Sequence, residues 1–460
     1  MKSQWDTIAA IATAPGEAGI AIVRISGPQS LVIADKVFRG KGPRPSERSP
    51  NTFLLGFIHS PFETDNEEDL DEVILLIYRA PHSYTREDVV EIQGHGGRTC
   101  ARRILRAVMN AGARAAEPGE FTKRAFLNGR IDLLQAEAVA DLIQARSQRA
   151  AAAALEQLDG RLSALFTATY DNLLEIAADL EATLDFPEEK LPVSTISAVM
   201  TRLEGVTRDL RDLLATWEEG NLLREGALVV ISGRPNVGKS TLLNCLLGTD
   251  RAIVTDIAGT TRDTIEEQIV LDGVVLRLVD TAGLREPSCT IEREGVQRAQ
   301  AYVEKADINL HVIDCSENLN VEDKGLLKTL ELGKTVIVLN KSDLGQLVQP
   351  DNLGGFSAVV CSLIRGEGIP GLKEAILDKL GIEREVPSHA VISERHRQFI
   401  QNALNNLDEA VDLLSTGKED VVVVSAGLVR NALESLGTIT GRVYDDEMLE
   451  SIFSRFCVGK

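Results

Sequence analysis

The sequence is short of positive charge, of closely spaced cysteines and of long apolar runs. Its 460 residues hold 69 Asp and Glu against 49 Lys and Arg, a net charge of −20. The first 128 residues are neutral, with 16 basic and 16 acidic side chains, so the acidic excess lies after them. A chain this acidic is poorly suited to tight, unaided binding of a phosphate backbone. Any nucleic-acid partner is expected to need a second, positive surface.

Cysteine spacing and apolar runs exclude further classes of protein. The six cysteines are scattered, and no pair has the C-x-x-C spacing of a zinc site or a disulfide framework. There is no apolar run of 18 residues, and the best candidate, Val421–Val424, is too short to span a bilayer. The start of the sequence has no basic segment followed by an apolar stretch. We therefore expect a cytoplasmic protein without a membrane span.

The remaining composition is typical of a folded chain, with 44% hydrophobic and 26% charged residues and room for two to four domains. Short apolar segments bounded by Pro and Gly dominate residues 1–128, and helical spacing dominates 129–220. Strands alternate with helices over 221–383, and helical spacing returns over 384–460. We expect a multidomain α/β and α+β fold. Its α/β domain is inserted into a helical domain, so that the helices before and after the insertion pack together.

Three local predictions accompany this organisation. Asp272-Gly273, between two apolar segments, predicts a two-residue hairpin. The mostly acidic run 63–72 is expected to be a solvated loop. The six histidines show no ligand spacing, and we expect them to be structural or solvated.

A phosphate-binding motif stands at Gly233–Ser240. The segment reads G-R-P-N-V-G-K-S, follows a strand pattern and opens a helical one, which is the context that the motif G-x-x-x-x-G-K-[ST] requires. Glycines there let backbone N–H groups close around phosphate oxygens at a helix N-terminus. Lys239 is expected to neutralise β/γ-phosphate charge, and Ser240 to ligate Mg²⁺.

Two later motifs point to GTP. Asp280-Thr281-Ala282-Gly283 ends a strand. There the Asp280 carboxylate can hold the coordination shell of Mg²⁺, and the Gly283 N–H can contact the γ-phosphate. In Asn340-Lys341-Ser342-Asp343, the Asp343 carboxylate is suited to accept hydrogen bonds from guanine N1 and N2, a donor pair that adenine lacks. Ser362-Leu363 stands where a Ser-Ala guanine-contact pair is usual, and still allows a backbone contact. These motifs resemble the translation-factor-like branch of small GTPases.

The residue after the Asp280–Gly283 motif bears on the mechanism. Many GTPases have a glutamine there to orient the attacking water. This chain has Leu284, which cannot orient water by hydrogen bonding. Hydrolysis must therefore draw on another polar group, and on a cation in place of an arginine finger.

Further segments, together with these motifs, carry a resemblance to a known family. They are Asp6–Thr13, Val23–Pro28, Ser83–Gly97, Pro118–Leu133 and Phe456–Lys460. With the GTPase motifs between them, the chain resembles, essentially end to end, the bacterial and organellar tRNA-modification GTPase family MnmE (TrmE).

The resemblance implies a folate-binding and dimerising N-terminal domain (1–128), a helical domain in two parts (129–220 and 384–460) and an inserted G domain (221–383). Arg24, Glu91 and Arg130 match positions that contact a one-carbon donor, 5-formyl- or 5,10-methylene-tetrahydrofolate. Lys460 matches a further folate contact. Cys457 matches the conspicuous cysteine of the family's C-terminal tail. We count it among the catalytic residues, either as a group that takes part in the chemistry or as one that lines the site.

Within the G domain, the resemblance implies a K⁺ ion held by Asn236, Thr255, Ile257 and Thr260. It also implies Mg²⁺ ligation by Ser240 and Thr261, and a catalytic Glu292 that acts through an intermediate water. K⁺ beside the β/γ-phosphates would act where an arginine finger does, with dimerised G domains closing the loop around it. The expected nucleotide contacts are Gly233, Asn236, Val237, Gly238, Lys239, Ser240, Thr241, Thr255, Asp256, Ile257, Ala258, Gly259, Thr260, Thr261, Asp280, Thr281, Ala282, Gly283, Asn340, Lys341, Asp343, Ser362 and Leu363.

The implied function is K⁺-activated, Mg²⁺-dependent GTP hydrolysis coupled to tRNA modification. The modification is the addition of an aminomethyl or carboxymethylaminomethyl group to C5 of the wobble uridine. The resemblance implies a homodimer that forms a heterotetramer with an FAD-dependent partner of the MnmG (GidA) type, which binds most of the tRNA.

Other interpretations stay open at this point. A ribosome-assembly GTPase shares the G motifs but usually carries a basic RNA-binding module, whereas the regions outside this G domain are neutral or acidic. A structural dimer with a vestigial G domain is disfavoured by the intact Lys239, Asp280 and Asp343. On the residues alone, Glu292 is typical of the charged first turn of a helix, and Arg24 of an ordinary strand-face arginine.

Overall fold

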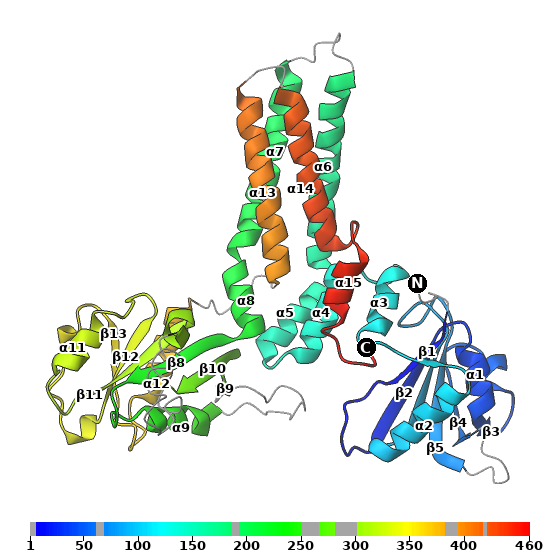
Figure 1. The fold of residues 1–460 in the computed structure, drawn as a ribbon, viewed down its shortest axis with the longest axis horizontal. Coiled ribbons are helices and arrows are strands. Elements are labelled where there is room, and N and C mark those ends of the chain that lie inside the picture. Colours follow the sequence, from blue (N-terminus) through cyan, green and yellow to red (C-terminus); the bar gives the residue numbers. More distant parts are fainter. Residues whose placement is uncertain are drawn as a thin grey trace, which may run out of the picture. The chain divides into compact units, whose positions relative to one another are not determined.

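The computed structural model describes residues 6–60, 69–185, 193–250, 266–280, 301–381, 393–416 and 421–460. The chain forms two compact units (Figure 1). The first comprises Met1–Ala140, Gln157–Leu174 and Leu433–Lys460, and the second comprises Asp141–Glu156 and Glu175–Ala432.

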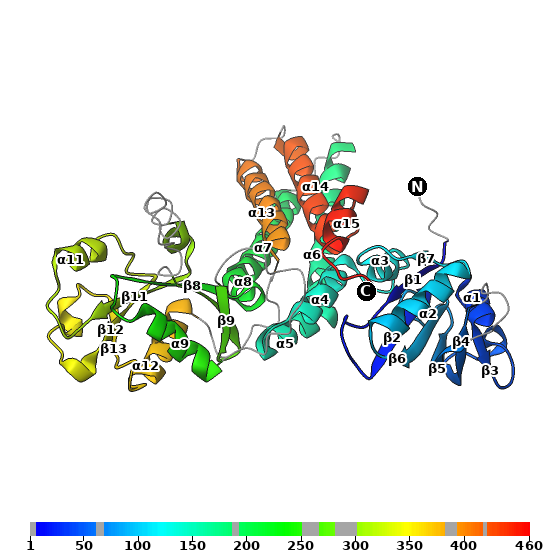
Figure 2. The same ribbon diagram turned by 60° about the horizontal axis from the view of Figure 1, so that its bottom comes forward.

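The first unit is built on a seven-stranded sheet in the order β3-β4-β5-β6-β2-β1-β7. Neighbouring strands are antiparallel except β1 and β7, which are parallel. The strands are β1 (Ile8–Ile11), β2 (Ile20–Ser26), β3 (Phe38–Gly40), β4 (Thr52–His59), β5 (Asp69–Tyr78), β6 (Val89–His95) and β7 (Arg114–Ala115). Helices α1 (Ser30–Val37) and α2 (Arg98–Asn110) lie on one face of the sheet, and α3 (Glu120–Leu127) follows β7 (Figures 1 and 2).

The alternation of apolar residues sets the two faces of this sheet. On the helix-covered face, Val23, Ile92 and Leu75 pack with residues of α1 and α2. On the opposite face of β4, Phe53 and Leu55 are exposed. Their cross-strand partners on β5 are Leu76 and Ile74, so a row of apolar side chains remains on this open face.

The prediction of a solvated loop over 63–72 was wrong in its second half. Residues 69–72 belong to β5, and the Asp71 side chain, only 7% exposed, accepts hydrogen bonds from the backbone N–H and the ring of His95. Pairing with β4, in which Glu72 lies opposite Phe57 and Asp71 opposite Ile58, outweighs the acidic character of these residues. Residues 63–68 lie outside the described residues.

Helices form the parts of the chain before and after the inserted sheet domain. They are α4 (Leu133–Gln144), α5 (Gln148–Leu158), α6 (Arg161–Asp185), α7 (Val193–Ala215), α8 (Trp217–Glu225), α13 (Glu394–Ser415), α14 (Val421–Thr440) and α15 (Asp446–Phe453). As expected, α7 and α13, which stand on either side of the insertion, pack side by side (Figures 1 and 2). Arg211 of α7 also forms an ion pair with Asp408 of α13 at 2.5 Å.

The inserted domain has a six-stranded sheet in the order β13-β12-β11-β8-β10-β9. Only β9 is antiparallel to its neighbour. The elements are β8 (Ala227–Gly233), α9 (Lys239–Asp250), β9 (Glu266–Leu271), β10 (Val274–Asp280), β11 (Ile308–Asp314), α11 (Val321–Leu327), β12 (Thr335–Asn340), β13 (Ser357–Val360) and α12 (Ile369–Leu380). The predicted hairpin is confirmed: Asp272 and Gly273 join β9 to β10 with φ of 48° and 82°, the left-handed values of a tight turn.

One described helix, α14, is long and apolar enough to cross a membrane, a possibility that the sequence had been expected to exclude. Half of its apolar stretch is buried inside the structure. Core helices of soluble proteins show the same combination, so the length and hydropathy of α14 are weak evidence for a span.

Candidate functional site

The loop between β8 and α9 is shaped by residues with positive φ. Gly233 and Gly238 adopt φ of 135° and 109°, and Asn236 adopts 63°. A Cβ atom on Gly233 would lie 2.4 Å from the Val312 carbonyl oxygen, and one on Gly238 would lie 2.3 Å from the Asn340 amide nitrogen. Only glycine therefore fits at these two positions, and the loop turns tightly into the N-terminus of α9, where backbone N–H groups can bind phosphate.

This turn is followed in the chain by two functional side chains at the start of α9. Lys239, the first residue of α9, is buried, and its Nζ donates hydrogen bonds to the carbonyl oxygens of Gly233 (3.0 Å) and Arg234 (2.7 Å). The next residue, Ser240, donates its Oγ–H to Asp280 Oδ2 at 3.0 Å. Asp280 ends β10, which is parallel to β8, so the two predicted oxygen donors for Mg²⁺ meet at the carboxyl edge of the sheet.

The end of β12 connects the predicted guanine contacts to this loop. Asn340 Nδ2 donates to the Val237 carbonyl oxygen at 2.8 Å, and Asn340 Oδ1 accepts from the Leu363 N–H at 3.2 Å. Ser362 donates to Asp343 Oδ1 at 2.7 Å, and this hydrogen bond holds the pKa of the Asp343 carboxyl below its usual value. Asp343 is therefore ionised at neutral pH and able to accept hydrogen bonds from a base.

Several residues that support this site were missed by sequence reasoning. Asp314 pairs at 2.6 Å with Lys341, itself a predicted nucleotide contact, which has φ of 67°. Arg234 of the loop pairs with Asp323 at 2.7 Å, and Asp323 is buried at the N-terminus of α11. The available signal was the pair Asn320 and Asp323, which form a reciprocal capping box at this helix start.

A buried histidine lies beneath the loop. His311 of β11 shares a 2.9 Å hydrogen bond between its Nδ1 and Ser232 Oγ. Burial lowers the pKa of His311 to about 4, with an opposing contribution from Asp323, so the ring is neutral at physiological pH. This agrees with the expected structural role for the histidines. Within the described residues there is no group of three or more potential metal-ligating His, Cys, Asp or Glu side chains.

Part of the predicted nucleotide site lies outside the described residues. This applies to Thr255, Asp256, Ile257, Ala258, Gly259, Thr260, Thr261, Thr281, Ala282, Gly283, Leu284 and Glu292. The residues that the structure brings together are those of the phosphate loop, Asp280 and the guanine-contact segments.

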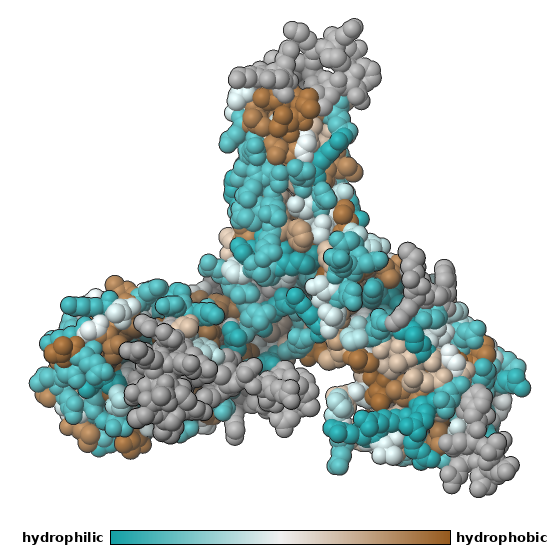
Figure 3. Space-filling model, viewed as in Figure 1, coloured by the Kyte–Doolittle hydropathy of each residue, from teal (hydrophilic) through white to brown (hydrophobic). Residues whose placement is uncertain are grey.

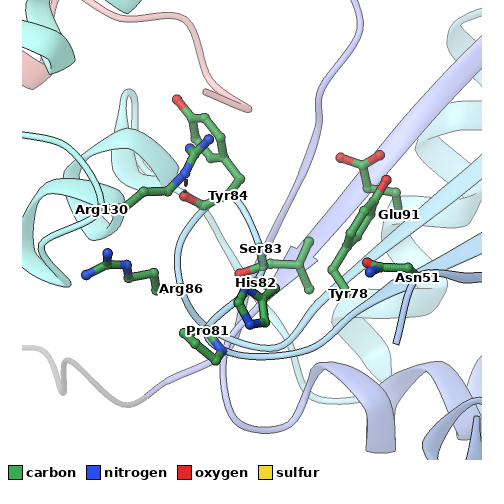
Figure 4. Close-up of a pocket in the computed structure, with 10 residues that line it drawn as sticks. Asn51, Tyr78, Pro81, His82, Ser83, Tyr84, Arg86, Glu91 and Arg130 are labelled. Atoms are coloured by element: carbon green, nitrogen blue, oxygen red, sulfur yellow. Dashed lines mark hydrogen bonds between the residues drawn. The ribbon is translucent and has the colours of Figure 1, made fainter. Parts of the chain in front are cut away.

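A second candidate site lies in the first unit, on the open face of its sheet. Arg24 of β2 and Glu91 of β6 are directly opposite in the strand register. Arg24 Nε donates to Glu91 Oε1 at 2.8 Å, and both side chains are only 14% exposed. A pocket of about 570 Å³ opens beside Glu91 (Figure 4). It is lined by Asn51, Tyr78, Pro81, His82, Ser83, Tyr84, Arg86, Val89, Glu91 and Arg130.

The C-terminal tail brings Lys460 to this pair. Gly459 is buried with φ of 100°, and a Cβ atom there would lie 2.3 Å from the Ile11 carbonyl oxygen of β1. Burial lowers the pKa of Lys460, the positive charge of Arg24 lowers it further, and Glu91 opposes them. Three of the four predicted folate residues therefore interact electrostatically, although Lys460 is hundreds of positions from Arg24 and Glu91 in the chain.

Tyr84 connects the fourth residue, Arg130, to this group. The guanidinium carbons of Arg24 and Arg130 lie 5.3 and 4.8 Å from the centre of the Tyr84 ring. Arg130 Nη1 also donates to the Tyr84 carbonyl oxygen at 3.1 Å (Figure 4). The Tyr84 hydroxyl lies 2.9 Å from Thr122 Oγ1. Sequence reasoning quoted Tyr84 in a family segment but gave it no role, because its two partners are distant in the sequence.

Cys457 is exposed on the tail. Its carbonyl oxygen accepts hydrogen bonds from the N–H groups of Gly119 (3.5 Å) and Lys460 (3.4 Å). Its Sγ atom makes no hydrogen bond to any residue in the described ranges. The five cysteines within those ranges are all free thiols.

Comparisons with known proteins cover the whole chain. The MnmE helical domain family matches residues 133–457, and the family described as GTP-binding protein TrmE N-terminus matches residues 7–130. The tRNA modification GTPase MnmE of Ligilactobacillus salivarius (strain UCC118) is 43% identical over 100% of this chain and 99% of its own length. The protein of that name from Moorella thermoacetica (strain ATCC 39073 / JCM 9320) is 44% identical over 99% of each chain.

A solved structure is also similar in sequence over the inserted domain. The G domain of the T. maritima FeoB iron transporter is 28% identical and matches 33% of this chain and 98% of its own, with a TM-score of 0.26. A score this low supports no statement about the fold. The family assignment therefore depends on the full-length relatives and on the two domain families.

Proposed function

The chain belongs to the MnmE (TrmE) family as a GTPase involved in tRNA modification, and from this premise we propose a more specific function. We propose that it hydrolyses GTP with Mg²⁺ and K⁺, and that hydrolysis is coupled to C5 modification of the wobble uridine with a tetrahydrofolate one-carbon donor. It acts in the cytoplasm as a homodimer, in a heterotetramer with an FAD-dependent partner of the MnmG (GidA) type. The single observation that best supports this proposal is the convergence of Arg24, Glu91 and Lys460 beside a pocket.

The nucleotide site supports the GTPase part of this proposal. Ser240 and Asp280 present two oxygen atoms 3.0 Å apart, a donor set that suits a hard cation such as Mg²⁺. Mg²⁺, when bound, neutralises charge on the β- and γ-phosphates. Lys239 adds a positive charge at the start of α9, and Asp343 accepts hydrogen bonds from the guanine N1 and N2 donors.

The proposed water-positioning residue and most of the K⁺ ligands lie outside the described residues. The proposal that Glu292 acts through a water depends on the family resemblance and on Leu284, which cannot orient water. Asn236 lies within the described residues, in the phosphate loop, where its backbone is left-handed with φ of 63°. A cation bound there would lie close to the β- and γ-phosphates, where positive charge lowers the barrier to hydrolysis.

The pocket in the first unit suits a planar, polar ligand. Arg130, Arg24 and Lys460 supply positive charge for carboxylates, Glu91 supplies an acceptor, and the rings of Tyr78 and Tyr84 supply flat apolar surface. Tetrahydrofolate has a flat pterin ring with several donors and a glutamate tail with carboxylates. The combination of groups around the pocket therefore fits a folate.

The open face of the sheet supports a homodimer. Phe53, Leu55 and Ile74 are exposed by 74%, 64% and 41%, and they lie in one row because Leu55 and Ile74 are cross-strand partners. A row of large apolar side chains on a sheet face is typical of a protein interface. The same face carries Glu91, which is the cross-strand partner of Leu76, so the interface and the pocket are adjacent.

The experiment that tests the catalytic proposal compares GTP hydrolysis in K⁺ and in Na⁺ at equal ionic strength. We expect hydrolysis to be much faster in K⁺, and Glu292→Ala to abolish turnover while GTP binding is retained. Glu294→Ala, two residues away in the same charged run, is the matched control and should keep its activity. Equal rates in both salts would contradict the K⁺ site, and an active Glu292→Ala variant would contradict the role of Glu292.

A further inference from the structure

Helix α2 has an unusual outer surface for a chain with a net charge of −20. Four of its thirteen residues are arginines, and the helix contains no Asp, Glu or Lys. Arg98, Arg102 and Arg106 are spaced by four residues, so they form a stripe with steps of about 6 Å, and Arg103 lies beside it. All four arginines are exposed.

The opposite side of α2 is occupied by the core of the sheet domain. Ala101, Ile104, Ala107 and Val108 are buried, and α2 packs on β1, β2, β5 and β6. Its apolar face is therefore unavailable for insertion into a lipid surface, which amphipathic membrane-binding helices require. The arginines remain as a purely electrostatic surface, and Figure 3 shows hydrophilic side chains over this helix.

Among the residues that the structure describes, none neutralises the charge of this surface by a direct ionic contact. Surface helices usually mix charges of both signs, yet no ion pair or side-chain hydrogen bond joins any of these four guanidinium groups to another residue in the described ranges. By contrast, Arg114 and Arg124 of the same unit are each paired with two or more carboxylates. With respect to the described part of the chain, the arginines of α2 are thus available to an external anion.

We propose that the arginine stripe of α2 binds the phosphate backbone of tRNA. Arginine suits this partner because its planar guanidinium donates two parallel hydrogen bonds to a phosphate, and a row of them matches a row of phosphates. Such contacts anchor and orient the RNA without reading its sequence. The stripe lies on the helix-covered face of the sheet, opposite the pocket, so it remains accessible when the open face forms a dimer interface.

This inference adds to the proposed function, and it rests on tRNA being the substrate. It also modifies the expectation that the partner subunit supplies the positive surface for tRNA. The stripe would provide a small, salt-sensitive contribution from this chain, in keeping with the neutral charge of its first 128 residues.

The test measures binding of an unmodified tRNA transcript with a wobble uridine to the full-length protein, by fluorescence anisotropy over a range of KCl concentrations. Arg102→Gln/Arg106→Gln is compared with Arg161→Gln/Arg208→Gln, which removes two exposed arginines from helices α6 and α7. We expect the α2 variant to bind more weakly and its slope of log K against log[salt] to flatten by about 2, while the control keeps the original slope. Unchanged thermal unfolding and GTP hydrolysis would establish that the α2 variant is folded.

Each other outcome contradicts the proposal in a distinguishable way. If the original protein binds tRNA and the α2 variant binds it with the same affinity and slope, this inference is wrong while the proposed function stands. If the original protein does not bind the transcript at any salt concentration, the stripe is not an RNA surface. If the α2 variant binds tRNA normally but cells carrying it lose wobble modification, the stripe contacts an acidic protein surface instead.

Discussion

At the scale of single residues, Tyr84 is the side chain that organises the pocket of the first unit. The guanidinium carbons of Arg24 and Arg130 both lie over its ring, at 5.3 and 4.8 Å from the ring centre, and its hydroxyl lies 2.9 Å from Thr122 Oγ1. An aromatic ring that contacts two guanidinium groups attracts both of them and so limits their motion. The ring, more than the hydroxyl, is therefore expected to determine how the two cations are presented to a folate.

We predict that Tyr84→Leu weakens binding of 5-formyl-tetrahydrofolate while Tyr84→Phe retains most of the affinity. Two cation–π contacts of about 0.5–1 kcal/mol each correspond to a loss of roughly five- to thirty-fold in Kd. Isothermal titration calorimetry on both variants measures the difference. Equal affinity of the leucine and phenylalanine variants would show that the ring does not position the arginines.

Asp343 is a second residue whose chemistry leads to a specific prediction. We expect Asp343→Asn to reduce GTP affinity by about tenfold or more and to improve binding of XTP, because an amide donates to the C2 carbonyl oxygen that xanthine has in place of the guanine amino group. Asp351→Asn, at an exposed acid nearby, is the control. Competition between labelled GTP and XTP measures both effects. If the Asp343→Asn variant keeps its preference for GTP over XTP, Asp343 does not recognise the base.

At the scale of elements, α3 is tied to the start of the chain by an ionic cluster. Arg124 of α3 pairs with Asp6 (2.8 Å), Glu87 (3.1 Å) and Glu120 (3.0 Å). Arg114 of β7 pairs with Asp6 and Glu120, both at 2.7 Å. The hydrogen bond from Arg114 is the largest cause of the lowered pKa of Asp6. For Glu120, burial raises the pKa, but the hydrogen bonds from Arg114 and other groups outweigh it and leave the pKa lowered.

This cluster predicts a pH dependence of stability. A carboxyl group whose pKa is lowered on folding stabilises the folded state above its unfolded pKa of about 4, and this contribution is lost as the pH falls through the folded pKa. We expect Arg114→Met to lower the free energy of unfolding of the first unit by about 1–2 kcal/mol at pH 7, and the difference from the original protein to shrink below pH 4. Urea unfolding at several pH values measures it, with Arg98→Met as the control. If the two proteins differ in their free energy of unfolding by the same amount at low pH, the loss of stability comes from packing and not from the ion pairs.

The elements also show where sequence patterns succeed. The hairpin at Asp272 and Gly273 was predicted because a two-residue turn with left-handed φ has a local sequence signature. The acidic residues 69–72 were misplaced because their position in β5 depends on pairing with β4 and on the hydrogen bonds from His95 to Asp71, both of which involve distant partners. Local conformation is thus readable where it depends on adjacent residues, and less so where it depends on strand pairing.

At the scale of the whole molecule, the open face of the sheet leads to a prediction about assembly. We expect Leu55→Asp to convert the dimer to a monomer, because a buried unpaired carboxylate at the centre of an apolar interface is strongly unfavourable. Val423→Asp, at a valine of α14 that is 59% exposed, is the control and should remain dimeric. Light scattering after size-exclusion chromatography measures both masses. A dimeric Leu55→Asp variant would place the interface elsewhere.

The sequence by itself determined the nucleotide chemistry and the order of the domains. The phosphate loop, Asp280 and the Asn340–Asp343 segment are short motifs, and each of them does its chemistry with residues that are adjacent in the chain. The insertion of the sheet domain was also predictable, because the change from helical to strand periodicity and back is visible along the sequence.

Only the tertiary structure decided how the second site is built and which residues support the first. Lys460 lies beside Arg24 because Gly459 permits a close approach to β1, and Tyr84 contacts two arginines that are more than a hundred residues apart. The pairing of Arg234 with Asp323 and the arginine stripe of α2 likewise depend on which side chains meet. Periodicity predicts which face of an element is buried. Which side chains contact one another, and which charges stay without a partner, depends on the folded chain.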